Sequence, residues 1–173
     1  MPALHRGTEW HFVTTHLETQ ALAPVQDAQA SELIGTVLAD LDGTTVLGGD
    51  LNSDAANPGA PSWTPTYDRL LAAGFTDAWE QSGHSARDPG FTCCQAPDLR
   101  NAMSTLDERI DFVLVRRARN PSASGFVPGS IMLDVVGAAE ADRTAQSSLW
   151  PSDHAGLMAT LRLAPGLANP SGG

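Results

Sequence analysis

The apolar segments of this chain stop abruptly at clusters of small polar and charged residues, and this limits the folds that it can adopt. One β-type run ends at His16, a second runs into "GGDLNSD" (48–54), and "WPSDH" (150–154) precedes the last. Ligand sites of sheets that pack against helices gather where strands end. The three clusters therefore indicate a sheet whose strand ends carry a polar site.

Strand and helix patterns alternate along the first half of the chain. Pro24 fits a first helical turn, apolar residues then recur at helical spacing up to a stop at Gly43, and a shorter helix is expected over 64–74. Strands are expected at 11–18, 44–52, 109–117, 129–137 and 155–163. This order predicts an α/β fold with helices on one face of a sheet.

The length of 173 residues is enough for one domain with a core, which we expect over 1–163, followed by a disordered tail over 164–173. No stretch approaches the roughly 20 apolar residues of a membrane span. The first residues lack the apolar core of a signal peptide. The sequence therefore predicts no membrane span and leaves the cellular location open.

The charge of the chain argues against one class of partner. Its formal net charge is -10, and all ten basic residues are Arg. Non-specific binding of a long polyanion requires a basic surface that makes several phosphate contacts. Acidic residues clustered for metal binding would account for part of the excess, and solubility for the rest.

Asp50 and Asn52 form the first candidate site. Gly48 and Gly49 before them allow a tight turn and a close approach of the backbone. Side chains two residues apart on an extended chain point the same way, so the pair can hold a divalent ion or orient a phosphate or a water. The structural alternative is an Asx turn that follows a strand.

A second set of candidates lies around "RIDFVLV" and "SDH". The carboxylate of Asp111 in an apolar strand needs a partner, either Arg109 or an imidazole that it would hold in one tautomer. Asp153 and His154 are neighbours that point to opposite faces of an extended chain, so one can bind a metal and the other a substrate. A capped turn is the alternative, and His16 has a structural alternative as well.

Two further features are interpreted as structural. Cys93 and Cys94 are adjacent, which is not the spacing of a zinc finger and is an unfavourable geometry for a disulfide. We interpret them as thiols, with pairing of one Cys to another chain as the alternative. The four Trp residues are expected in the core rather than around a pocket; they are Trp10, Trp63, Trp79 and Trp150.

The order of these motifs is more specific than any one of them. "THL", "GDxN", "RIDFVL" and "SDH" before a final apolar strand resembles the C-terminal half of the endonuclease/exonuclease/phosphatase family, over about residues 8 to 163. "TCCQAPDLRN" also resembles a bacterial branch of that family. The resemblance implies a deoxyribonuclease I-like α/β/β/α sandwich, of which this chain would form one sheet layer with helices on one face.

The resemblance also implies roles for individual residues. His16 would bind the phosphate and stabilise its charge in the transition state. Asp50 and Asn52 would position the attacking water. Asp111 would orient His154, which would act on the scissile phosphate or as the general base. An activated water and neutralised phosphate oxygens are what phosphodiester hydrolysis requires.

The same resemblance implies a divalent cation and a substrate class. Asp50 and Asp153 would be metal ligands for Mg²⁺ or Mn²⁺, with Ca²⁺ as the alternative ion. Because the chain is acidic, small phosphodiesters, phosphomonoesters or lipid head groups fit it better than duplex DNA. The expected function is therefore that of a metal-dependent phosphoesterase.

The sequence departs from the family in length. Family members carry an Asn and a metal-binding Glu in an N-terminal half, and neither Glu9 nor Glu18 has the context of that Glu. We therefore expect a fragment or a natural short form. One sheet layer would expose an apolar face, which a homodimer, a repacked topology or another chain would cover.

Two other functions remain as alternatives. The first is a catalytically weak or inactive family remnant that binds a metal or a partner. The second is a serine esterase or lipase, because "GHSAR" (83–87) resembles a nucleophile elbow with Ser85 as the nucleophile. Arg87 stands where that motif has Gly.

Overall fold

The structure is a computed structural model that describes residues 2–5, 8–84, 87–118 and 126–163. The expected tail over 164–173 and Ser85 lie outside the described residues. Its elements are β1 (Pro2–His5), β2 (Thr8–His16), η1 (Gln20–Leu22), α1 (Ala23–Glu32), η2 (Leu33–Val37), β3 (Thr44–Asp50), α2 (Thr66–Ala72), β4 (Thr76–Asp77), α3 (Ala78–Gln81), β5 (Asp111–Arg116), β6 (Phe126–Val136), η3 (Glu140–Asp142) and β7 (Gly156–Leu163). No helix among these residues is long and apolar enough to cross a membrane.

The described strands form two sheets. The larger has five strands in the order β1-β2-β3-β5-β4, and β6 and β7 form a separate antiparallel pair. Strands β2 and β3 are parallel, with α1 in the crossover between them, and β5 runs antiparallel to β3. The α/β prediction is confirmed, and the structure adds a second sheet to the single layer that the sequence predicts.

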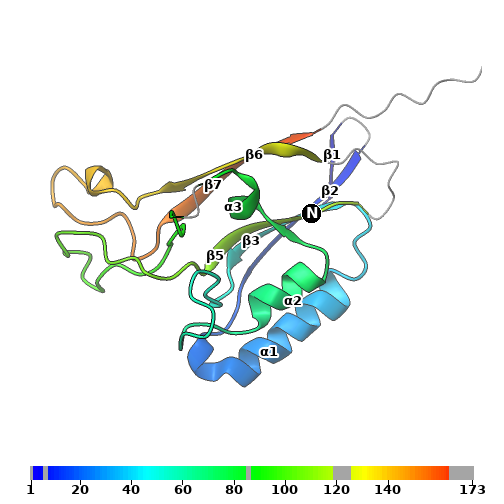
Figure 1. The fold of residues 1–173 in the computed structure, drawn as a ribbon, viewed down its shortest axis with the longest axis horizontal. Helices are drawn as coiled ribbons and strands as arrows, with labels where there is room; N and C mark the ends of the chain where they lie inside the picture. The colour runs from blue at the N-terminus through cyan, green and yellow to red at the C-terminus, as the bar shows by residue number, and fades with distance from the viewer. Residues whose placement is uncertain (1, 6–7, 85–86, 119–125, 164–173) are drawn as a thin grey trace, which may run out of the picture.

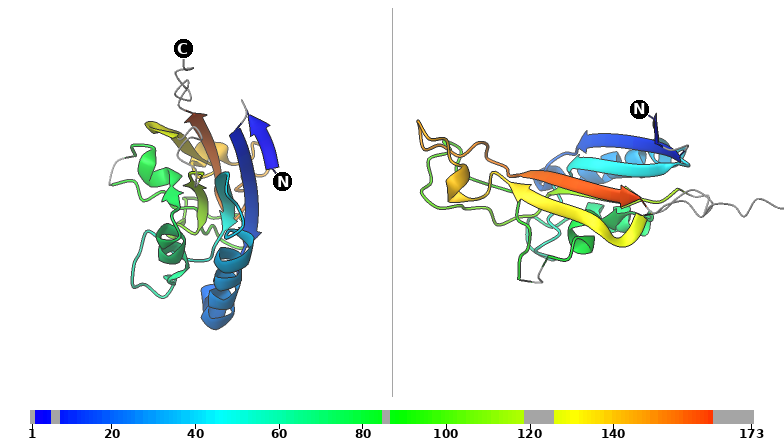
Figure 2. Two further views of the ribbon diagram at one scale, coloured as in Figure 1. Left: turned by 90° about the vertical axis from the view of Figure 1, so that its right-hand side faces the viewer. Right: turned by 90° about the horizontal axis from the view of Figure 1, so that it is seen from above.

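Other elements pack on both faces of the large sheet, fully on one and partly on the other, which gives three layers (Figures 1 and 2). One face packs on α1 and α2 through a buried core that includes Leu47, Leu70 and Leu114. The opposite face of β5 packs on α3 and on the inner sides of β6 and β7. Successive side chains of β5 point to opposite faces, and both faces of this strand are buried. The strand is therefore apolar on both faces.

The small sheet does not extend over the whole inner face of the large one. Leu161 of β7 reaches Trp10 and Val115. Phe12 lies on the same face of β2 as Trp10 and stacks on it at 6.2 Å, yet 55% of its surface is exposed. An apolar edge of the inner face is therefore accessible to a partner.

Two glycines act through close approach of the backbone. Gly49 has a φ of +145°, and a Cβ there would lie 1.9 Å from the carbonyl oxygen of Thr15. At Gly43 a Cβ would lie 2.7 Å from the carbonyl oxygen of Glu9. Gly43 is thus required because the backbone of β2 lies too close for any side chain there. It does not end the preceding helical segment, as was expected, because that segment ends at Val37.

Candidate active site

Three of the candidate residues lie in one row across the large sheet. His16 pairs with Asp50 in the parallel β2–β3 ladder, and Asp50 pairs with Asp111 in the antiparallel β3–β5 ladder. The Nε2 atom of His16 lies 3.3 Å from Oδ2 of Asp50. The strand ends that the sequence marked as polar therefore meet at one edge of the sheet.

His154 joins this row from the loop before β7. Its Nδ1 atom lies 2.8 Å from Oδ2 of Asp111, and both side chains are partly buried. Arg109, the alternative partner of Asp111, turns away and pairs with Asp77 and Glu80. The imidazole is thus the partner of Asp111, and this bond fixes the tautomer and the orientation of the ring.

The electrostatics of the site favour a cation. Burial lowers the pKa of His154, but the hydrogen bond to Asp111 and the charges of Asp111, Asp50 and Asp153 raise it more, so the pKa lies above its usual value. Burial raises the pKa of Asp50, the N–H of Asn52 lowers it and the charge of Asp111 raises it, with a net increase. The shift of His154 reflects the negative charge of the carboxylates around it, and that of Asp50 reflects mainly its burial. A divalent cation would relieve the repulsion between the carboxylates of Asp50 and Asp111.

Asp50, Asp111 and His154 are a possible ligand set for that cation. Each offers one ligand atom, and these atoms all lie within 4.8 Å of one another. Carboxylate oxygens suit Mg²⁺ and Mn²⁺, and imidazole suits transition metals. Asp153 is exposed and accepts from Oγ of Ser152 at 3.1 Å, outside this group, so its role as a metal ligand stays a prediction.

Asn52 has a local structural role in the site. It adopts a φ of +47°, its backbone N–H donates to Oδ1 of Asp50 at 2.8 Å, and its side-chain amide donates to the carbonyl of Leu17 at 3.0 Å. The first bond is the Asx turn that the sequence offered as an alternative. Asn52 therefore links the ends of β2 and β3 and holds one oxygen of Asp50.

Gln26 of α1 supports this turn and was not singled out from the sequence. It is 1% exposed, and its Nε2 donates to the carbonyls of Glu18 and Asn52 at 2.7 and 2.8 Å. Its Oε1 accepts from the hydroxyls of Thr64 and Thr66. The sequence offers one sign of this role: a polar Gln within a predicted helix, which needs hydrogen-bond partners if it is buried.

Thr92 supports the other side of the site and was also not singled out. Its buried hydroxyl accepts from the backbone N–H groups of Ile110 and Asp111 at 3.2 and 3.1 Å. It therefore holds the first residue of β5 in place. The loop that carries Thr92 also carries the two Cys residues.

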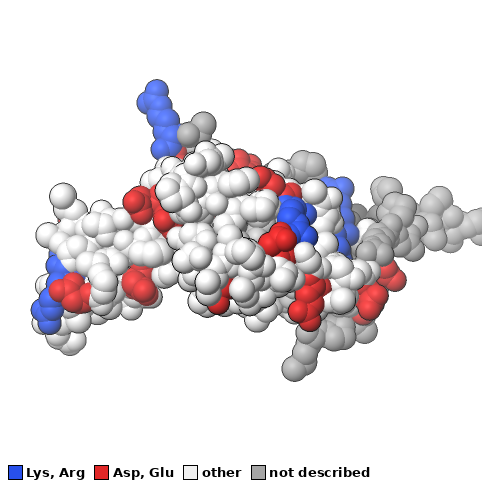
Figure 3. Space-filling model, turned by 90° about the horizontal axis from the view of Figure 1, so that it is seen from below, with Lys and Arg blue, Asp and Glu red and all other residues white. Residues whose placement is uncertain are grey.

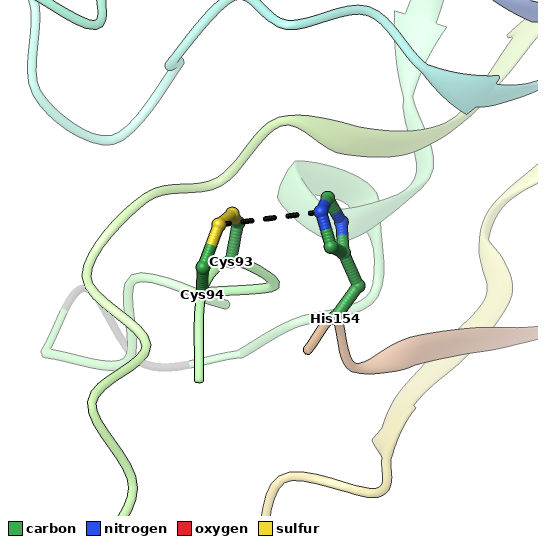
Figure 4. A group of neighbouring side chains, drawn as sticks. All are labelled: Cys93, Cys94 and His154. Carbon is green, nitrogen blue, oxygen red and sulfur yellow. Dashed lines mark hydrogen bonds between the residues drawn. A yellow bond between two sulfur atoms is a disulfide. The ribbon is translucent and has the colours of Figure 1, made fainter. Parts of the chain in front are cut away.

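Cys93 and Cys94 are bonded to each other, in place of the thiols that the sequence favoured. Their peptide bond is cis. Figure 4 shows the sulfur atoms pointing toward the ring of His154, with Sγ of Cys94 4.0 Å from Nε2. The two sulfur atoms therefore lie next to His154, the histidine of the candidate active site.

His84 of the "GHSAR" motif is held by two contacts. His84 stacks on Trp79 with ring centroids 3.7 Å apart, and its Nε2 lies 2.6 Å from the carbonyl oxygen of Leu133. Trp10, Trp79 and Trp150 are buried as expected, whereas Trp63 is only half-buried, so the prediction for it was wrong. Trp79 also borders a cavity beside His84. The imidazole of His84 is thus committed to this packing.

Comparison with known proteins identifies the family of the chain. The model of the endonuclease/exonuclease/phosphatase family matches residues 3–154. The chain belongs to this family. Enzymes of the family are generally hydrolases of phosphoester bonds and typically use divalent metals such as Mg²⁺. No curated protein matches the chain.

Solved structures share the fold at low sequence identity. Truncated TDP2 from Caenorhabditis elegans is 22% identical, with a TM-score of 0.59, over 92% of this chain and 57% of that one. TDP2 from D. rerio, complexed with a single strand DNA product, is 17% identical, with a TM-score of 0.61, over 90% and 57%. A family protein from Leptotrichia buccalis is 14% identical, with a TM-score of 0.57, over 94% and 52%. The chain thus spans little more than half the length of these proteins.

Proposed function

We propose that this protein is a divalent-metal-dependent phosphoesterase that hydrolyses phosphodiesters or phosphomonoesters by attack of water. The observation that carries the proposal is the 2.8 Å contact between His154 and Asp111, beside Asp50. The imidazole of His154 is hydrogen-bonded to one carboxylate, Asp111, and lies beside a second, Asp50. This arrangement suits proton transfer next to a bound cation.

Each residue of the row has a distinct task in this proposal. His154 accepts the proton of the attacking water at Nε2, and Asp111 stabilises the imidazolium that results. His16, whose side chain is 72% exposed, donates to a phosphate oxygen. Asp50 orients the water, with one oxygen held by the turn at Asn52. A Mg²⁺ or Mn²⁺ held by a carboxylate oxygen of Asp50, which leaves Nε2 of His154 free, would neutralise charge on the phosphate oxygens.

We propose small phosphoesters or lipid head groups as substrates, rather than duplex DNA. Figure 3 shows acidic side chains scattered over one face of the molecule with few basic ones between them. The net charge of -10 opposes a long polyanion. The single strand DNA product bound by the D. rerio relative makes a short single strand the alternative to test beside them.

Hydrolysis of bis(p-nitrophenyl) phosphate tests the proposal. We expect turnover with Mg²⁺ or Mn²⁺, none in EDTA, and a loss of about 10²–10⁴-fold in His154→Ala, the range of a positioned acid–base group. His84→Ala is the matched control and should retain turnover, because its ring packs on Trp79 away from the row. Turnover that survives EDTA or His154→Ala would contradict the proposal.

A metal-binding domain without catalysis is a second candidate. It is favoured by the side chain of Asn52, whose amide donates to a backbone carbonyl instead of presenting itself to a water. Calorimetric titration with Mn²⁺ separates the two. Binding that Asp50→Asn abolishes, without turnover of any phosphoester, would support this candidate over the phosphoesterase.

We further propose that a second copy covers the accessible edge of the inner sheet face, around Phe12. We expect a homodimer in analytical ultracentrifugation and a monomer in Phe12→Glu, because a charge at an apolar interface is costly. Met158→Glu, on the outer face of β7 and 56% exposed, should leave the dimer intact. A monomeric wild-type chain would refute the homodimer.

A further inference from the structure

His154 faces a second group of metal-binding atoms on the side away from Asp111. The sulfur atoms of Cys93 and Cys94 and a ring nitrogen of His154 all lie within 4.8 Å of one another. Figure 4 shows both cysteines directed at the imidazole, and the Sγ of Cys94 is 4.0 Å from Nε2. Two sulfurs and one imidazole nitrogen are a donor set of a different chemical character from the carboxylates of the row.

The backbone fixes this arrangement. Cys93 forms antiparallel bridges with both His154 and Glu108. On either side of the first bridge, the N–H of Ala155 donates to the carbonyl of Thr92 and the N–H of Gln95 donates to that of Asp153, each at 2.8 Å. Side chains of residues that pair directly across two strands lie on the same face and close together. The side chain of Cys93 is thus held beside the imidazole by main-chain bonds, and the sulfur of Cys94 is joined to that of Cys93.

The hydrogen bond of His154 to Asp111 leaves Nε2 as the ring nitrogen that can bind a metal. Nδ1 of His154 is bonded to Oδ2 of Asp111, so Nε2 is the nitrogen that meets the sulfurs. A histidine that ligates zinc usually has its second nitrogen bonded to a carboxylate or carbonyl, which sets the tautomer and raises its basicity. Thiolate ligands select Zn²⁺ over Mg²⁺, and three protein ligands leave a fourth tetrahedral position for water.

We propose that Cys93, Cys94 and His154 form a binding site for Zn²⁺ once the disulfide is reduced. A phosphine reductant supplies the two electrons that break the S–S bond and becomes a phosphine oxide with oxygen from water. The two sulfurs take up protons as thiols. Zn²⁺ then binds the sulfurs and Nε2, and the thiol protons pass to solvent.

The site shares His154 with the row of Asp50 and Asp111. Zn²⁺ bound through Nε2 occupies the nitrogen that the proposed phosphoesterase uses for proton transfer. Reduction and zinc together therefore withdraw His154 from that chemistry, while the oxidised chain keeps it available. The zinc site itself does not depend on the proposed activity, since it requires only the three ligands.

Cobalt substitution in the full chain tests this site without measuring turnover. The chain is reduced with a phosphine, its thiols are counted, and it is titrated with Co²⁺. We expect one Co²⁺ per chain, a sulfur-to-cobalt charge-transfer band in the near ultraviolet, and loss of that band on addition of Zn²⁺. The unreduced chain should give no such band.

Matched variants assign the ligands. Cys94→Ser should remove most of the band. His154→Ala should keep a weaker band with affinity lower by more than about tenfold, because loss of even a residue that only supports a metal ligand costs about 10–100-fold. His84→Ala, whose ring packs on Trp79 and takes no part in the three-ligand group, should leave the band unchanged. A reduced wild-type chain with both thiols counted and no band would overturn the proposal, and so would a band that survives Cys94→Ser or thiols that cannot be released by reduction.

Discussion

Asp111→Asn is expected to lower kcat for phosphodiester hydrolysis by about 10²–10⁴-fold while the fold is preserved. The carboxylate is the partner of Nδ1 of His154 at 2.8 Å, and it stabilises the positive ring that proton transfer produces. An amide of the same shape can present its NH₂ group to Nδ1, which favours the wrong tautomer. The measurement is kcat and KM with saturating Mg²⁺ or Mn²⁺, with circular dichroism to verify the fold.

A proton-sensitive measurement separates this role from a structural one. Asp111 contributes to the raised pKa of His154, so Asp111→Asn should lower that pKa in an NMR titration of the metal-free protein. Because folding raises the pKa of His154, this histidine contributes to the free energy of unfolding at every pH below its unfolded pKa of about 6.5. The contribution is lost as the pH rises through the folded-state pKa. Asp68→Asn, an exposed carboxylate on α2, should change neither kcat nor the titration. An unchanged kcat in Asp111→Asn would contradict the assignment.

Asp77→Ala is expected to reduce the free energy of unfolding by about 3–5 kcal/mol, the range for an ion pair broken in a protein interior. Asp77 accepts from the guanidinium of Arg109, from the hydroxyl of Tyr67 and from the N–H of Trp79. The side chains of Asp77 and Arg109 are 3% and 6% exposed. The substitution leaves a charged guanidinium buried against the rings of Tyr67 and Phe112.

Urea denaturation followed by Trp fluorescence checks this value. Glu80→Gln is the matched control, because Glu80 contacts the same guanidinium at 3.1 Å but is 61% exposed. Its loss should change stability by only about 0–1 kcal/mol, as for a surface ion pair. Equal effects of the two substitutions would show that burial of Asp77 does not carry the stabilisation.

The candidate site could be located from the sequence because strand ends are visible as breaks in apolar runs. His16 and Asp50 are polar residues at such ends, and the order of the motifs "THL", "GDxN", "RIDFVL" and "SDH" supplied the resemblance to the family. Their pairing in register could not be read, because register depends on how β2, β3 and β5 align in space. The choice of His154 over Arg109 as the partner of Asp111 likewise required the structure.

Residues that support the site, such as Gln26, could not be predicted from the sequence for a different reason. Gln26 acts through its side-chain amide on carbonyls that lie 8 and 26 residues away in the chain. The second sheet of β6 and β7 was also not foreseen, since an apolar strand pattern gives no information on which sheet a strand joins. Contacts between distant segments are fixed by packing, which a single sequence does not display.

The row across β2, β3 and β5 also ties ligand binding to folding. Asp50, Asp111 and His154 are brought within 4.8 Å only when three distant segments are in register, so the unfolded chain offers no comparable site. A cation that binds this site therefore binds the native state alone and stabilises it by mass action, by about 2.7 kcal/mol at a hundredfold excess over its dissociation constant. The midpoint of thermal unfolding should then rise with the concentration of the cation, which gives a measure of binding that does not depend on turnover.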